Sequence, residues 1–196
     1  KKFKPDDSSI FEGNGSKKKE KWGELIWFRP REIYKGDYKL FQKDPEFFDN
    51  NMYSSALRAS TNYIQPEDIV QGELGDCYFL ASVASIAEWP KRIKSLFISK
   101  KANKYGIYCI RICFNGEWVA VVLDDLIPCK RILRLPIFTS GNGNELWVQL
   151  LEKAWAKLYS NYERIEAGLT REALHDLTGA PTKVIFNDDN NLWKEI

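Results

Sequence analysis

An apolar stretch without helix breakers runs from Cys77 to the residue before Pro90. Its length predicts a buried helix over residues 76–89. The residues just before it are of the kinds that form turns and helix starts, namely Gly72, Gly75 and Asp76. The pattern therefore predicts a glycine-rich turn that leads directly into a central helix.

Two runs rich in β-branched and aromatic residues follow, at residues 106–114 and 118–123. Asn115 and Gly116 stand between them, and this dipeptide is typical of a two-residue hairpin turn. We therefore expect a β-hairpin here. Residues 124–144 are expected to form a loop.

A second helix is predicted over residues 145–158, where apolar residues recur at helical spacing. These residues are Leu146, Leu150, Leu151, Ala154, Trp155 and Leu158, and Lys153 and Lys157 fall on another face. A shorter helix is expected from Thr170, as the N-cap, to Gly179 just past its end. Together the elements predict an α+β fold with a central buried helix, additional helices and a β-hairpin.

Composition indicates one globular domain preceded by an arm. The chain has 196 residues, of which 44% are hydrophobic and 14% aromatic, enough for a sizeable core. Residues 1–24 look irregular and are expected to form a flexible N-terminal arm, with the domain over residues 25–196. Further short elements are expected around residues 45–48 and 184–186.

Charge gives no electrostatic argument for nucleic-acid binding, since 29 basic and 27 acidic residues are interspersed and the net charge is +2. The basic run at residues 17–21 is expected to be a solvated arm, with nuclear localisation or anionic-lipid contact as alternatives. The sequence shows neither a transmembrane stretch nor a signal peptide. We therefore expect a cytoplasmic protein whose four cysteines are reduced thiols.

Cys77 is the strongest candidate for chemistry. A thiol at a helix N-terminus lies at the positive end of the helix dipole, which favours the nucleophilic thiolate. Gln71 stands six residues upstream and offers a side-chain amide that could donate to an oxyanion beside the sulfur. The alternative is that Cys77 is an inert buried filler, as most free cysteines are.

The segment Gln71-Gly-Glu-Leu-Gly-Asp-Cys-Tyr-Phe-Leu80 resembles the cysteine box of the calpain family, which reads Gln-Gly-x-Leu-Gly-Asp-Cys-Trp-Phe-Leu. Only Tyr78 departs from it. Three later blocks are also similar to the family, at residues 115–128, 144–158 and 172–179. The last block has Ala180 where the family has a second glycine.

This resemblance implies the first half of a papain-like cysteine protease core, from a calcium-dependent cysteine endopeptidase. It assigns Cys77 as the nucleophile and Gln71 as the oxyanion-hole donor. It also assigns Gly168 as a backbone contact for extended substrate, although Ala167 replaces a neighbouring glycine. The implied partners are protein or peptide substrates and a second protease-core subdomain.

The resemblance also implies a calcium site in this half of the core. Its side-chain ligands map to Asp68 and Glu145, and its backbone carbonyls map to Thr61 and Tyr63, where the family has glycine at position 63. Two carboxylates with carbonyl oxygens suit calcium. From the residues alone, Asp68 and Glu145 are also ordinary acids at helix starts.

A cysteine protease needs a histidine base and a residue to orient it. In papain-like enzymes they lie about 130–150 residues beyond the cysteine, farther than this sequence extends, and His175 is the single histidine. We expect the chain to be one subdomain of a larger protease and catalytically silent alone. The alternatives are a non-catalytic calpain-like regulatory or interaction module and a thiol-based redox sensor.

Overall fold

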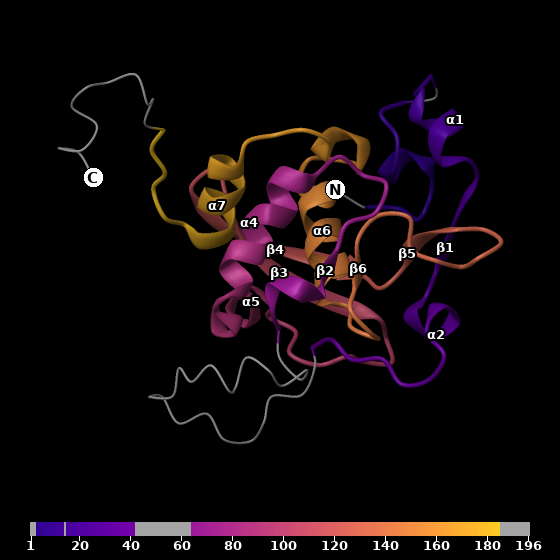
Figure 1. Ribbon diagram of the computed structural model, residues 1–196, viewed down its shortest axis with the longest axis horizontal. Helices are drawn as coiled ribbons and strands as arrows, with labels where there is room; N and C mark the ends of the chain where they lie inside the picture. The colour runs from indigo at the N-terminus through magenta and orange to yellow at the C-terminus, as the bar shows by residue number, and fades with distance from the viewer. Residues whose placement is uncertain (1–2, 14, 42–63, 185–196) are drawn as a thin grey trace.

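The computed structural model describes residues 3–13, 15–41 and 64–184 and confirms the α+β class (Figure 1). The four longest helices of the described part all lie within residues 64–184. They are α4 (Cys77–Ala87), α5 (Pro90–Leu96), α6 (Trp147–Leu158) and α7 (Thr170–Thr178). Shorter helical segments precede and connect them: η1 (Asp7–Ser9), α1 (Lys18–Trp22), α2 (Pro30–Ile33), η2 (Pro66–Asp68) and η3 (Glu163–Ile165).

Three two-stranded antiparallel sheets complete the described fold. The predicted hairpin is confirmed as β3 (Ile107–Phe114) and β4 (Glu117–Asp124), with Phe114 opposite Glu117. Asn115 and Gly116 both have positive φ, +53° and +81°, as a tight hairpin turn of this kind requires. The other pairs are β1 (Leu25–Phe28) with β5 (Ile127–Lys130), and β2 (Ile69–Val70) with β6 (Ser140–Gly141).

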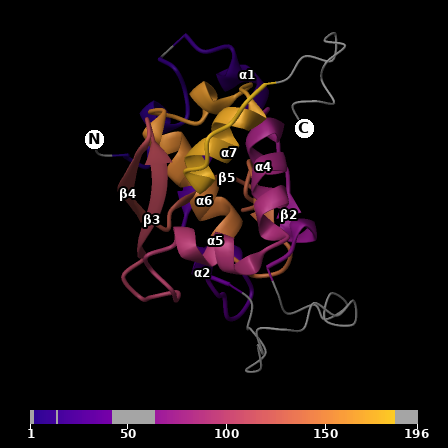
Figure 2. The same ribbon diagram turned by 90° about the vertical axis from the view of Figure 1, so that its left-hand side faces the viewer.

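Helix α6 runs through the middle of the molecule, with the β3–β4 hairpin on one flank and α4 on the other (Figure 2). Every residue from 147 to 156 is buried, so this helix has no solvent face over most of its length. Its aromatic anchor is Trp155, which stacks on Phe79 of α4 with ring centroids 4.8 Å apart. The buried helix thereby fixes the position of α4.

Lys153, expected on another face of α6 than the apolar residues, is buried as well. Its ammonium group forms an ion pair with Asp124 at 2.5 Å and donates to the backbone carbonyl of Leu126 at 2.6 Å. Burial lowers the pKa of Lys153, and Asp124 acts in the opposite direction. The spacing of apolar residues in the sequence predicts the helix, but it does not show which segments pack against the polar side of that helix.

The described N-terminal residues are packed against this core rather than set apart from it. Ile10, Phe11 and Trp22 are buried, and the Trp22 ring meets Phe138 edge-on at 4.9 Å. The backbone N–H of Tyr162 donates to the carbonyl of Ser9. The apolar residues of this segment therefore belong to the same core as residues 64–184.

Other differences concern short elements. The stretch at residues 124–144, expected as loop, contains β5 and β6. Helix α5 begins at Pro90, shortly after the end of α4. The elements expected at residues 45–48 and from 185 onward lie outside the described residues. Within the described part of the chain, no helix is both long and apolar enough to cross a membrane.

Candidate active site

Cys77 is the first residue of α4, and its side chain is exposed. The N–H groups of Phe79 and Leu80 both donate to the carbonyl of Asp76. The N–H groups of Cys77 itself and Tyr78 precede the helical ladder and point out of the helix N-terminus. The thiol therefore lies beside backbone donors at the positive end of a helix.

The segment before Cys77, residues 71–76, is referred to below as the cysteine loop. Its outer residues Gln71, Gly72, Glu73 and Gly75 are exposed, whereas Leu74 and Asp76 are buried. The Gln71 side-chain amide donates to the carbonyl of Leu74 at 2.8 Å. This bond holds the amide of Gln71 on the same loop that leads to Cys77.

Gly72 is required by the packing of the cysteine loop. A Cβ atom at this position would overlap with the carbonyl oxygens of Ile137 and Phe138. The neighbouring N–H of Glu73 donates to the Ile137 carbonyl at 2.9 Å. At Gly75, by contrast, a Cβ would meet only the Glu166 side chain at ordinary contact distance. The two glycines of the motif thus have different structural roles.

Asp76 stands at the N-cap of α4, in the turn expected from the sequence, but its side chain makes no capping hydrogen bond. Its carboxyl is fully buried and lies beside that of Glu152 on α6, which is also buried. Burial raises the pKa of both groups, and the nearby Asp76 raises that of Glu152 further. If both were ionised, neither oxygen of Asp76 would have a donor. A proton on Glu152, donated to Asp76, satisfies the pair.

A second loop, residues 166–169, lies against the cysteine loop and is called the facing loop. The N–H of Ala167 donates to the carbonyl of Gly75 at 2.9 Å. Ala167 has a positive φ of +57°, a region that glycine adopts more readily. The side chain of Glu166 forms an ion pair with Lys18 of α1 at 2.6 Å. These contacts join the two loops into one exposed surface.

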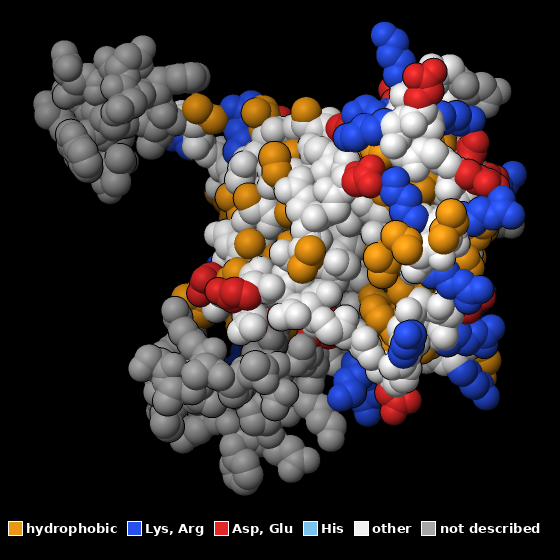
Figure 3. Space-filling view, turned by 45° about the vertical axis from the view of Figure 1, so that its right-hand side comes forward, with side chains coloured by type: hydrophobic (Ala, Val, Ile, Leu, Met, Phe, Trp, Pro, Cys, Tyr) orange, Lys and Arg blue, Asp and Glu red, His pale blue; other side chains and the backbone are white. Residues whose placement is uncertain are grey.

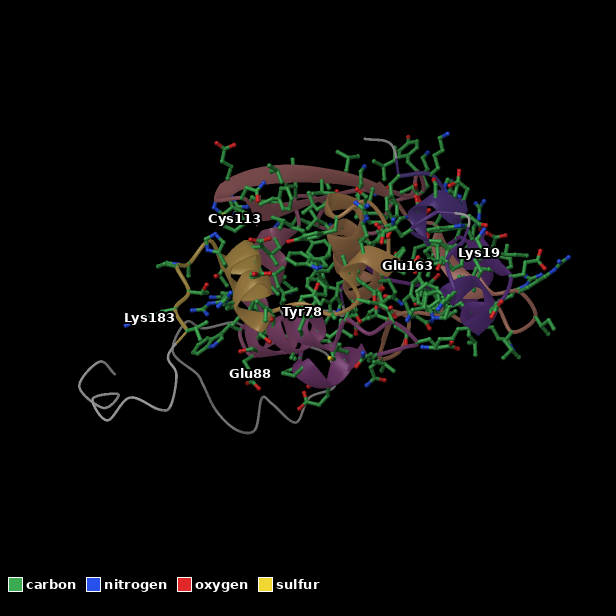
Figure 4. The ribbon with its side chains drawn as sticks, turned by 90° about the horizontal axis from the view of Figure 1, so that it is seen from above. Lys19, Tyr78, Glu88, Cys113, Glu163 and Lys183 are labelled. Atoms are coloured by element: carbon green, nitrogen blue, oxygen red, sulfur yellow. The ribbon has the colours of Figure 1, made fainter. Side chains whose placement is uncertain are left out.

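Gly168 is exposed and packs directly over the ring of Tyr78. Figure 4 labels Tyr78, which belongs to the first turn of α4. A Cβ at residue 168 would come within 2.5 Å of the Tyr78 ring. The Tyr78 hydroxyl in turn accepts a hydrogen bond from the indole N–H of Trp155 at 3.1 Å. The tyrosine at this position of the cysteine box therefore connects the facing loop to α6.

The two carboxylates expected to bind calcium flank the small β2–β6 sheet. Asp68 immediately precedes β2, and Glu145 follows β6 after a short loop. Both are buried, and the N–H of Asn142 donates to the Asp68 carbonyl at 3.0 Å, which ties the two segments together. Asp68 accepts from the N–H of Gln65, and Glu145 accepts from the indole of Trp147.

Calcium prefers oxygen ligands, and the buried carboxylates of Asp68 and Glu145 on two adjoining segments are ligands of this kind. Thr61 and Tyr63 lie outside the described residues. Among the residues that are described, no group of three or more His, Cys, Asp or Glu side chains is positioned to hold a metal. A site here would accordingly depend on backbone carbonyls as well as on the two carboxylates.

His175 does not join Cys77. It lies in the last turn of α7, with its Nδ1 atom 2.8 Å from the carbonyl oxygen of Ala180. It lines a surface hollow of about 470 Å³, together with Asn115, Tyr159 and Asp176, and Cys77 does not line this hollow. Within the described residues, Gln71 and Cys77 therefore stand on the same loop and helix start, and His175 lies on a different element.

Glu152 is the site-proximal residue that sequence reasoning missed. The residue is part of a block that resembles the family, but its helical position gives no sign of an acidic partner. No local signal in the sequence could have found it, because the burial of its carboxyl and its neighbour Asp76 are decided by the packing of distant segments.

Comparison with known proteins shows similarity along the whole chain. The family model described as calpain family cysteine protease matches residues 1–196. The calpain-type cysteine protease ADL1 of Oryza sativa subsp. japonica is 42% identical over 205 aligned positions, which cover 99% of this chain and 9% of that protein. The calpain-type cysteine protease DEK1 of Zea mays is 42% identical over 90% of this chain and 8% of its own length. The calpain-1 catalytic subunit of Mus musculus is 42% identical over 59% of this chain and 16% of its own.

Proposed function

Because the chain belongs to the calpain family of cysteine proteases, we propose that it forms the nucleophilic half of an endopeptidase active site. The observation that carries this proposal is the exposed Cys77 thiol at the N-terminus of α4. The cysteine loop, which leads into this helix, is held in place by the packing of Gly72. The chain spans about a tenth of the plant relatives it matches, so substrates and partners of a whole protein are also part of the proposal.

In the proposed reaction the Cys77 thiolate attacks the carbonyl carbon of the scissile peptide bond. The carbonyl oxygen becomes an oxyanion, and we propose that the backbone N–H of Cys77 donates to it. The side-chain amide of Gln71 carries two hydrogens, and only one is needed for the bond to Leu74. The other is the second donor to the oxyanion.

The facing loop supplies the substrate contact. The N–H of Ala167 is already used by Gly75, whereas Gly168 presents exposed backbone next to Tyr78. We propose that an extended substrate pairs with Gly168 as an added strand. The missing Cβ at this position lets the substrate backbone come close.

The proton of the thiol must pass to a base, which then protonates the leaving amine and activates the hydrolytic water. His175 is held near Ala180 in a different hollow, so we assign it no part in this step. We propose that a second protease-core subdomain supplies the histidine and its orienting residue. The chain alone is then expected to be catalytically silent.

The test uses a longer protein that joins this chain to that second subdomain. Cys77→Ser should lower the rate of peptide cleavage at least about a thousandfold while the protein remains folded. Cys109→Ser, at a partly buried cysteine of β3, is the matched control and should retain activity. The 196-residue chain should not hydrolyse the same peptide.

Two results would contradict this assignment. Cleavage that survives Cys77→Ser would exclude Cys77 as the nucleophile. Cleavage by the isolated chain that Cys77→Ala abolishes would show that a base lies within these residues. If the longer wild-type protein folds but cleaves no peptide, the alternative of a non-catalytic regulatory or interaction module is favoured.

We further propose that calcium binds between the segments at residues 68 and 145. The Asp68 and Glu145 carboxylates would hold the ion, with the backbone carbonyls of Thr61 and Tyr63. The ion would supply a fixed positive charge and would link the start of β2 to the start of α6. Strand β2 leads directly to Gln71. The proposal rests on two buried carboxylates on hydrogen-bonded segments.

Titration calorimetry and thermal unfolding of the chain test this proposal. Calcium should bind and raise the melting temperature, and magnesium should reproduce little of the effect. Asp68→Asn should remove the shift, whereas Glu67→Gln, at the exposed neighbouring acid, should preserve it. Absence of both heat and a thermal shift at millimolar calcium would leave Asp68 and Glu145 as structural acids.

A further inference from the structure

A hairpin tip on the side of the molecule formed by α1, β1 and α2 exposes large aliphatic side chains. The tip comprises residues 131–135 and follows β5 (Figure 1). Ile132 is 92% exposed, Leu133 67% and Leu135 57%. These residues play no part in the candidate active site.

The tip is a defined turn rather than a loose loop. The N–H of Arg134 donates to the carbonyl of Lys130 at 2.9 Å, and the N–H of Lys130 donates to that of Leu135 at 3.0 Å. Arg134 closes the turn with a positive φ of +53°, and its guanidinium packs over the Phe28 ring of β1, 5.2 Å from the centroid. The aliphatic side chains are therefore held outward by the backbone of a closed hairpin.

Cations surround this tip. Lys130 precedes it, and Arg131 and Arg134 lie within it. The Lys130 ammonium also reaches the Trp22 carbonyl at the end of α1 at 3.3 Å. Arg131 is paired with Glu24, and Lys130 with Glu73. Figure 3 shows blue Lys and Arg side chains around orange hydrophobic ones on this side.

Charge is unevenly distributed between this side and the remainder of the chain. Residues 17–35 and 127–137 contain ten Lys and Arg but three Asp and Glu, so the rest of the chain, with 19 basic and 24 acidic residues, is net negative. Acidic residues from outside these ranges also reach this side, since Glu73 pairs with Lys130, Glu166 with Lys18, Asp7 with Lys19 and Asp125 with Arg29. With these four acids added, ten basic residues still stand against seven acidic ones, so the side from which the aliphatic tip projects keeps an excess of positive charge.

We propose that the 131–135 tip docks on an anionic lipid bilayer. Exposed aliphatic side chains can enter the boundary between headgroups and acyl chains, while neighbouring Lys and Arg remain at the level of the anionic headgroups. A projecting tip suits a deformable bilayer, whereas a protein partner would need a complementary cavity. The basic run at residues 17–21 acts with the tip as part of one positive surface.

Docking in this way would also place the candidate active site relative to the membrane. The return segment of the hairpin leads to Ile137 and Phe138, whose carbonyls lie against Gly72 of the cysteine loop. The tip and the cysteine loop are consequently held by the same stretch of backbone. Membrane binding does not depend on the proposed protease activity and is tested without it.

The experiment measures sedimentation of the chain with vesicles of phosphatidylcholine, with and without phosphatidylserine. Phosphatidylserine should increase binding at least about tenfold, and added salt should reverse the increase. The double variant Ile132→Ser/Leu133→Ser should lose most of the binding without a change in melting temperature. The control Ile107→Ser/Val122→Ser alters two other exposed aliphatic residues, 57% and 52% exposed, on the β3–β4 hairpin and should bind as wild type.

Three outcomes would overturn the proposal. The first is equal vesicle binding by the tip variant and the wild type, or no binding by either. The second is binding to heparin, a soluble polyanion, that is as strong as binding to vesicles and is unchanged in the tip variant. This result would indicate that the natural partner is an acidic macromolecule. The third is self-association of the wild type that the tip variant abolishes, which would show that a second copy covers the tip.

Discussion

The cysteine loop and the facing loop form neighbouring parts of one exposed surface, yet different forces hold them. The cysteine loop is held by close packing of Gly72 against the backbone of Ile137 and Phe138, and by the buried carboxyl of Asp76. The facing loop is held mainly at its edges, by the Ala167 hydrogen bond and the Glu166 ion pair. In the proposed function the first loop positions the nucleophile and the second contacts the substrate. We therefore expect a substitution that meets packed backbone, at Gly72, to cost more than one that meets a side chain, at Gly75 or Gly168.

Gly72→Ala should have the largest effect. The added methyl group would overlap with backbone oxygens of Ile137 and Phe138, which cannot rotate away. We expect a loss of about 3 kcal/mol or more in the free energy of unfolding. Gly75→Ala is the matched control and should cost less than about 1 kcal/mol. Chemical denaturation of both variants measures the difference, and equal effects would remove the distinction between the two glycines.

Glu152→Gln should change how stability depends on pH. Burial raises the folded-state pKa of Asp76 and Glu152, so the folded protein binds protons more tightly than the unfolded chain. Their contribution to stability is present below the ordinary carboxyl range near pH 4 and is lost as the pH rises through the raised values.

Glutamine can donate to Asp76 without titrating. At pH 8 the Glu152→Gln variant should therefore be more stable than the wild type by about 1–3 kcal/mol, and the difference should shrink toward pH 4. Denaturation across this range measures it. A constant difference at every pH would show that the pair does not share a proton in the folded state.

Gly168→Ala should cost an intermediate amount in the facing loop. Its methyl group would press on the Tyr78 ring, a side chain that can yield at the expense of its bond to Trp155. We expect about 1–2 kcal/mol in the free energy of unfolding. The same substitution in a Tyr78→Ala background should cost almost nothing, as a double-mutant cycle would report. If the cost persists there, the facing loop is constrained by something other than Tyr78.

Ala167→Gly should have the smallest effect and the opposite sign. Glycine adopts the positive φ of this residue without steric cost, although it loses more entropy on folding. We expect a gain of roughly 0.5 kcal/mol. Thermal unfolding measures it, and a clear loss of stability would show that the Ala167 methyl group contributes packing.

The elements whose determinants lie close together in the chain were predicted correctly. The apolar stretch after Asp76 gave α4, the Asn115-Gly116 dipeptide gave the β3–β4 turn, and the spacing of apolar residues gave α6. Gly179 ends α7 with a positive φ of +70°, as expected of a glycine just past a helix. In each case the interactions join residues a few positions apart, which a local pattern can show.

The sequence also placed the candidate nucleophile at a helix start, because a cysteine after a glycine-rich turn is a local arrangement. Only the tertiary structure showed that Gly72 lies against Ile137 and Phe138 and that Asp76 lies against Glu152. It also showed that Lys153 is buried and that Ile132 is not. These outcomes depend on which distant segments pack together, and the free energy of burying a charge or exposing an aliphatic side chain is set by those neighbours.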